Sequence, residues 1–300
     1  MEEKRLQIRK TNIELCRIFS ILLVILVHSN FAWTGYPKTG DGIARFLIQG
    51  FSIIGVNVFV LITGYFSTSI KIKNIVNLFY ICVFYGIIKL FADIVFRSLN
   101  IKDLFFISKS NWFIISYLGL LFFTGFLNKL ESKKDFFRFC IPFSIYEVYF
   151  SFFPAIVDLD PGFNHGYSIL SFILIYVIGR YIRLFGFPNR FKKWSSLFYI
   201  SLSLMVGIIA FLIFTYGTKI GLKENFYIRV FDYNNPLVVL SSICFFTMFE
   251  KLNIKNNGFI NHIAKSVLAV LLVHGSSSLN MYMKLYFKKI LNINIVMGGE

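Results

Sequence analysis

Three ionisable residues with helical spacing lie near the start of the chain and could do chemistry. They are Glu14, Arg17 and His28, in the otherwise almost entirely apolar stretch "ELCRIFSILLVILVH". Histidine exchanges a proton near neutral pH, and arginine binds anionic groups. On an α-helix, Arg17 and His28 would lie about 20° apart around the axis and roughly 16 Å apart along it, so they share one face. Glu14 lies three residues before Arg17, which suits an ion pair that holds the guanidinium.

The cost of a charge in lipid restricts where Arg17 can point. A charged side chain at the centre of a membrane helix costs about 2.5 to 3.5 kcal/mol on insertion scales. We therefore expect Arg17 to face other helices or a wet cavity. The alternative is that Arg17 extends to the cytoplasmic headgroups and that His28 only ends the span.

A second histidine ends a later apolar stretch. His274 closes "INHIAKSVLAVLLVHG", and this stretch and the first one are both predicted to run from inside to outside. Lys265, nine residues earlier, lies half a turn away from His274 around such a helix. Intramembrane histidines indicate a function by default, and two at similar depth predict a polar cavity.

Composition and hydropathy identify the elements that must position these residues. The chain has 300 residues, of which 56% are hydrophobic and 15% are charged, and its mean hydropathy is +0.68. Apolar stretches long enough to cross a bilayer recur along it. The sequence therefore predicts an all-α, polytopic transmembrane helical bundle of about nine to ten spans. The nine clear ones are 13–32, 43–66, 75–96, 112–128, 137–156, 167–184, 195–216, 235–250 and 259–275, and a weaker tenth is 279–296.

The basic residues predict the orientation. Lys and Arg are more frequent in the segments that are inside if the N-terminus is cytoplasmic, among them "NKLESKKDFF" and "FGFPNRFKK". Of the 31 Lys and Arg residues, Arg17 and Lys89 are the two that are assigned to neither side of the membrane. The net charge of +16 thus reflects topology and contact with the lipid bilayer, and we expect no nucleic-acid partner.

Other classes of site find little support. The four histidines show no i,i+4 pair and no HExxH or CxxC motif, so we expect no metal. Glycine-rich nucleotide-binding loops are also missing from the sequence, which argues against nucleotide hydrolysis. With no linker or long polar insertion, residues 1–300 are predicted to form a single integral membrane domain.

The order of these features resembles the acyltransferase 3 family of integral membrane acyltransferases, whose members O-acetylate bacterial surface polysaccharides. The opening helix of that family carries an arginine and a histidine separated by ten residues, which are Arg17 and His28 here. Thr63 takes the place of a serine in a family turn. Six segments follow the family's order: "IELCRIFSILLVILVH", "GVNVFVLITGYF", "NWFIISYLGLLFF", "GYSILSFILIYVIGRYIR", "NNPLVVLSSICFF" and "INHIAKSVLAVLLVH".

The resemblance implies an acyl donor and an acceptor. The donor would be acetyl-CoA from the cytoplasm, and the acceptor a saccharide hydroxyl, in a multi-pass protein of the bacterial cell membrane. A neutral imidazole that removes the proton of this hydroxyl supplies about 10² to 10⁴ in rate, and His28 is the candidate for this base. Direct transfer and an acyl-His28 intermediate both remain open.

Further residues take roles in this interpretation. Arg17, with Glu14 beside it, would hold or organise the donor, while Lys71 and Lys73 would attract its phosphates. For the lysines, the positive-inside bias is the alternative explanation. The acceptor is expected near the outer residues Trp112, Tyr167 and His274, although Trp112 also suits an interfacial aromatic belt.

Two departures and two rival functions accompany the resemblance. Many family members carry an arginine pair where this chain has Lys71 and Lys73, and members usually have one more spanning helix after the late histidine.

The rivals are a flippase-like polysaccharide or lipid transporter and a non-catalytic member of the family. A transporter predicts inverted repeats, and none is visible in the sequence.

Overall fold

The fold is described by a computed structural model. It covers residues 10–38, 40–68, 72–95, 112–149 and 162–291. Within these ranges the chain forms helices and no strand, as predicted. The elements are α1 (Thr11–Val27), η1 (His28–Trp33), α2 (Ile43–Ser52), α3 (Gly55–Tyr65), α4 (Ile72–Val95), α6 (Trp112–Leu127), α7 (Lys133–Glu147), η5 (Asn164–Gly166), α8 (Ile169–Phe185), α9 (Asn189–Tyr216), η6 (Gly217–Ile220), η7 (Phe226–Phe231), α10 (Pro236–Glu250), α11 (Gly258–Ile263), η8 (Ala264–Ser266), α12 (Val267–Val273) and α13 (Ser277–Leu291).

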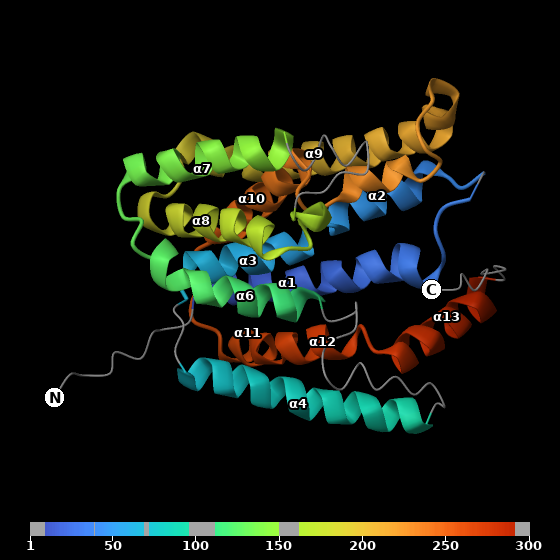
Figure 1. The fold of residues 1–300 in the computed structure, drawn as a ribbon, viewed down its shortest axis with the longest axis horizontal. Helices are drawn as coiled ribbons and strands as arrows, with labels where there is room; N and C mark the ends of the chain where they lie inside the picture. Colours follow the sequence, from blue (N-terminus) through green and yellow to red (C-terminus); the bar gives the residue numbers. More distant parts are fainter. Residues whose placement is uncertain (1–9, 39, 69–71, 96–111, 150–161, 292–300) are drawn as a thin grey trace.

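The long helices lie roughly side by side and alternate in direction (Figure 1). The end of the bundle at which α1 and α4 begin is called the inner end, because the charge pattern predicts that it is cytoplasmic; the opposite end is the outer end. The α3 helix packs against α1, α8 and α10, while α12 packs against α1 and α4. In Figure 1, α11 and α12 run between α4 and the rest of the bundle.

Length and hydropathy qualify several helices as membrane spans. Four described helical stretches are long and apolar enough to cross, Thr11–Trp33, Ile43–Tyr65, Ile75–Val95 and Asn189–Ile220. A fifth crossing results if Gly258–Val273 and Ser278–Phe287, which meet at 88°, count as one broken span. The apolar α6 is shorter, at 16 residues. These features confirm an all-α polytopic membrane bundle, and the count of nine to ten spans stays a prediction.

Local signals explain several helix boundaries. The Ser132 side chain accepts a hydrogen bond from the Asp135 amide, which caps the start of α7. Asn235 caps α10 in the same way through the Leu237 amide, and Pro236 follows it at the first helical position. At its other end, α8 stops at Gly186, whose φ is 64°.

Two glycines allow α3 and α8 to approach closely. A Cβ atom on Gly64 would lie 2.0 Å from the Tyr176 carbonyl oxygen, and one on Gly179 would lie 2.3 Å from the Leu61 carbonyl oxygen. Each helix thus contributes a glycine at its contact with the backbone of the other. Small residues of this kind are typical of helix contacts in membranes.

Candidate functional site

The two histidines at the outer ends of their helices are in contact. The ring centroids of His28 and His274 are 4.8 Å apart, and the rings meet edge to face. His28 follows α1 directly and opens the π-helical turn η1, while His274 follows α12. The His274 Nδ1 atom lies 2.6 Å from the Leu271 carbonyl oxygen, so it donates a proton there and leaves Nε2 without its hydrogen. The pair thus offers imidazole nitrogens that can accept a proton.

The helix after His274 is fastened to the element that carries His28. The Trp33 indole Nε1 in η1 donates a hydrogen bond of 2.7 Å to the Asn280 side chain in α13. Trp33 also stacks on Phe287, with ring centroids 6.3 Å apart. These contacts fix the end of α1 relative to the α12–α13 corner.

Arg17 lies on a cavity. Its guanidinium is 3.3 Å from the Glu14 carboxylate, as the spacing predicts, and the Glu14 side chain is 5% exposed against 29% for Arg17. Arg17 lines a cavity of about 430 Å³ between α1, α3, α4, α6 and α12, and Lys265 lines it from η8. This volume is typical of small-molecule sites. Lys265 was missed at the sequence level, where its angle was compared only with that of His274.

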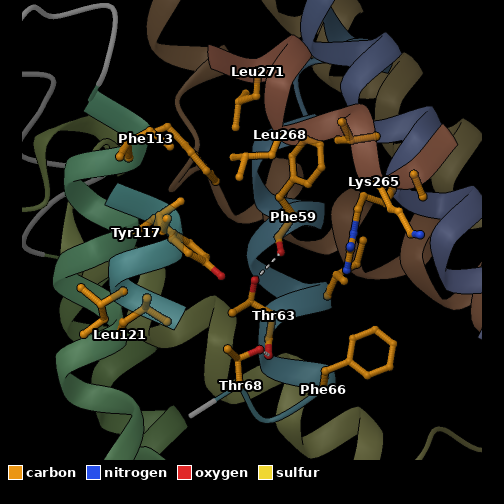
Figure 2. A pocket seen from close by; sticks show the side chains of 17 residues that line it. Phe59, Thr63, Phe66, Thr68, Phe113, Tyr117, Leu121, Lys265, Leu268 and Leu271 are labelled. Atoms are coloured by element: carbon orange, nitrogen blue, oxygen red, sulfur yellow. Dashed lines mark hydrogen bonds between the residues drawn. The ribbon is translucent and has the colours of Figure 1, made fainter. Parts of the chain in front are cut away.

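The rest of the cavity wall is mostly apolar (Figure 2). Figure 2 shows the Tyr117 hydroxyl pointing toward Thr63, whose own hydroxyl donates a 3.0 Å hydrogen bond to the Phe59 carbonyl oxygen. Leu271, whose carbonyl oxygen pairs with His274, also lines the wall. The cavity therefore extends from the Arg17 level to within one helical turn of the histidine pair.

At the inner end, two cations converge on one phenol. The Lys10 ammonium donates a 2.8 Å hydrogen bond to the Tyr65 hydroxyl, and the guanidinium of Arg183 lies 5.2 Å from the centre of the same ring. Tyr65 contacts Phe66 ring to ring at 5.5 Å, and Phe66 lines the cavity. We call this inner end of the bundle, beside the cavity residue Phe66, the inner mouth; it carries two cations that sequence reasoning did not single out.

The turn after α3 is held by a buried arginine. Arg180, 7% exposed, donates hydrogen bonds to the Ser67 hydroxyl at 2.7 Å and to the Asn128 and Leu130 carbonyl oxygens. Ser67 has a φ of 47°, a conformation that is unfavourable for a residue with a Cβ and needs this support. The neighbouring Thr68 lines the cavity.

Aromatic residues gather around Trp112. The Trp112 ring centroid lies 4.4 Å from that of Tyr167 and 5.6 Å from that of Tyr233. Trp112 and Tyr167, two of the residues expected near the acceptor saccharide, thus lie together, and Tyr233, which the sequence did not indicate, lies beside them. Phe113, the neighbour of Trp112, lines the cavity. Close by, His165 Nδ1 lies 3.1 Å from the Asp232 carboxylate.

The two lysines that were expected to attract the donor phosphates are not among the described residues that line the cavity. Lys73 is exposed in the first turn of α4 and does not line the cavity. Lys71 lies outside the described residues. In the described part of the chain, no group of three or more His, Cys, Asp or Glu residues is arranged to hold a metal ion.

Comparison with known proteins bears on the identity of this fold. A family model described as an acyltransferase domain matches residues 10–297, nearly the whole chain. The chain belongs to the acyltransferase 3 family. This confirms the resemblance and supports a membrane acyltransferase in general. No curated protein and no solved structure matches the chain significantly.

Membership of the acyltransferase 3 family indicates that the reaction to be explained by this geometry is acyl transfer. Acyl transfer needs a group that takes a proton from the attacking atom and a site that holds the acyl donor. The histidine pair can do the first, and the cavity with Arg17 and Lys265 can do the second.

Proposed function

We propose that this chain is a membrane-bound O-acyltransferase that moves an acetyl group from cytoplasmic acetyl-CoA to a hydroxyl of a surface polysaccharide or of its lipid-linked precursor. The cell membrane of a bacterium is the proposed location. The observation that carries the proposal is the His28–His274 contact one helical turn beyond a cavity that contains two cations.

The cavity suits the donor. Acetyl-CoA carries phosphates at one end and the thioester at the end of a long, flexible arm. The cations Lys10 and Arg183 at the inner mouth attract the phosphates, and Arg17 and Lys265 hold polar groups of the arm inside. Along this path the thioester points toward His28, which agrees with the roughly 16 Å rise between Arg17 and His28.

The reaction is a direct transfer in this proposal. His28 removes the proton of the acceptor hydroxyl while the oxygen attacks the thioester carbon. The C–O bond forms, the C–S bond breaks, and the proton passes from His28 to the departing thiolate. Glu14 keeps Arg17 oriented through its ion pair and does not reach the reacting atoms.

The acceptor is placed at the aromatic cluster of Trp112, Tyr167 and Tyr233. Aromatic faces and tyrosine hydroxyls offer apolar contact together with hydrogen bonds, which suits a sugar ring. The Tyr233 phenol is protonated at neutral pH, as an ordinary tyrosine is, and burial raises its pKa further. His274, which is also expected near the acceptor, contacts His28.

Transfer of labelled acetyl groups tests the proposal. Membranes from cells that express the wild type or His28→Ala would be incubated with [¹⁴C]acetyl-CoA, and the label would be counted in the precipitated polysaccharide and in the lipid extract. We expect labelling by the wild type and a loss of about 10² to 10⁴ in rate for His28→Ala, the contribution of a general base.

A matched control separates the role of His28 from a general loss of histidine. His262→Ala alters an exposed histidine in α11 and should label as the wild type does. Wild-type labelling no higher than that of empty membranes would contradict the acyltransferase proposal and favour a transporter or a non-catalytic role. Equal rates for the wild type and His28→Ala would refute the assignment of the base alone.

A further inference from the structure

A lysine and an aspartate are buried one helical turn apart on α4. Lys89 is 2% exposed and Asp93 is 0% exposed, although α4 is among the helices apolar and long enough to cross a membrane. Opposite charges with i,i+4 spacing point to the same side of a helix. Ionisable residues at such positions are expensive and typically functional.

This side of α4 faces the histidine pair. The helix packs against both α12 and α13, the helices that flank His274. Asp93, one turn after Lys89, accepts a hydrogen bond from the Ser278 amide, four residues after His274, so this side of α4 packs against the α12–α13 corner that holds His274. His28 is on the other side of His274, in ring contact with it. Lys89 and His274 are buried and His28 is half-buried, and the three belong to one region drawn from α4, the end of α12 and η1.

Asp93 fixes the corner in which His274 lies. Its Oδ1 accepts a 3.1 Å hydrogen bond from the Ser278 amide in the first turn of α13. A carboxylate at this place satisfies an otherwise unpaired helix amide and interacts favourably with the helix dipole. Together with the Trp33–Asn280 bond, this contact ties α13 to both α4 and η1.

Other cations of the described chain are less suited to act at the histidine pair. Arg17 is roughly 16 Å away along α1. Arg45, at the outer end, is engaged by the loop before α2 and by η1: it donates hydrogen bonds to Asp41 at 2.6 Å, to the Asn30 carbonyl oxygen at 2.6 Å, and to Gly35. Of Arg17, Arg45 and Lys89, it is Lys89 that is buried on the helix that packs against the α12–α13 corner.

We propose that the positive charge of Lys89 stabilises the oxyanion that forms during acyl transfer, and that Asp93 is a positioning residue that holds the α12–α13 corner. This inference rests on the proposed function. When the acceptor oxygen attacks the thioester carbon, negative charge develops on the acyl oxygen until the C–S bond breaks and the thiolate leaves with the proton from His28. A fixed positive charge in a site of low dielectric stabilises this oxyanion.

The test separates the effect of the Lys89 charge on catalysis from its effect on the stability of the fold. Lys89→Met removes the charge but leaves Asp93 buried without it, so the variant is paired with Lys89→Met/Asp93→Asn, in which both charges are gone and the asparagine oxygen can still accept from Ser278. For each variant, kcat and KM for [¹⁴C]acetyl-CoA and the thermal midpoint in detergent would be measured. Lys89→Arg keeps the charge, and Lys219→Met, an exposed outer lysine, controls for loss of a charge elsewhere.

We expect the double variant to fold with a thermal midpoint near that of the wild type, to lose about 10² to 10³ in kcat, and to change KM less than threefold. Lys89→Arg should recover at least a tenth of the wild-type kcat, and Lys219→Met should match the wild type. A double variant that is folded and as active as the wild type would overturn the inference, because Lys89 would then only neutralise Asp93. Absence of transfer by the wild type itself would instead overturn the proposed function, and the inference with it.

Discussion

The Glu14–Arg17 pair shows how one buried carboxylate sets the direction of a cation. Glu14 is 4% exposed, so its charge needs a partner inside the bundle, and Arg17 supplies one at 3.3 Å while it also lines the cavity. Breaking a buried pair from one side leaves an uncompensated charge, which is strongly destabilising. Variants at this position must therefore remove both charges or keep both.

The first residue-scale prediction concerns Arg17. Glu14→Gln/Arg17→Gln removes the pair without leaving a lone charge, and we expect KM for acetyl-CoA to rise about tenfold, the loss of one charge-assisted contact of about 1.4 kcal/mol. The kcat should change less, because Arg17 is far from His28. Steady-state kinetics with [¹⁴C]acetyl-CoA measures both quantities.

A control for this prediction is Arg138→Gln, which alters an exposed arginine of α7 that does not line the cavity. It should leave KM unchanged. If the double variant lowered kcat strongly while KM stayed at the wild-type value, Arg17 would act on the chemical step and its assignment to donor binding would be wrong.

The sequence predicted the local Glu14–Arg17 pair, but not the contacts between candidate residues on distant helices. Spacing alone placed Arg17 and His28 on one face and paired Glu14 with Arg17. The contact between His28 and His274 joins positions 246 residues apart, so it depends on how α12 packs against α1. The sequence showed that Lys89 is a charge within a predicted span, but only the fold shows which residues lie near it.

At the scale of elements, one close helix contact involves the segment that contains Thr63. Gly64 and Gly179 let α3 and α8 meet backbone to backbone. Thr63 lines the cavity, and the turn that follows α3 is held by Arg180 of α8. The α3–α8 contact thus positions one wall of the cavity.

Gly64→Ala is expected to destabilise this contact. The added Cβ would meet the Tyr176 carbonyl oxygen at 2.0 Å, and overpacking of this kind costs about 1 to 3 kcal/mol. The thermal midpoint of the protein in detergent should fall. Gly125→Ala is the matched control, because this glycine is also helical and has nothing within 4 Å of its Cβ position; equal midpoints for the two variants would contradict the tight contact.

Some element boundaries were predicted closely because they follow from hydropathy, whereas α9 begins at Asn189 and not near the predicted residue 195. The predicted spans 13–32 and 43–66 correspond to Thr11–Trp33 and Ile43–Tyr65. Within these spans, the change to a π-helical turn at His28 and the break between α2 and α3 were not predicted. Such irregularities depend on packing with other helices, and no local signal in "LVHSNFAW" distinguishes a π-helical turn from a regular one.

At the scale of the whole molecule, the cavity and the histidine pair lie in series along the bundle. The phenol of Tyr65 with its two cations is at the inner end, the cavity is in the middle, and His28 with His274 is toward the outer end. Such an order lets a donor enter from one side of a membrane while the acceptor reaches the other.

This arrangement predicts sidedness of the donor site. Acetyl-CoA is too polar to cross a bilayer, so only donor on the cytoplasmic side can reach the inner mouth if α1 begins there, as the charge pattern predicts. Inverted vesicles that contain the wild-type protein should transfer label from external [¹⁴C]acetyl-CoA, and right-side-out vesicles should transfer at least tenfold less until they are permeabilised with detergent. Right-side-out vesicles that label as fast as inverted ones before permeabilisation would show that the donor enters from the outer end. The direction proposed for the cavity would then be reversed, and the cations around Tyr65 would no longer explain the attraction of the donor phosphates.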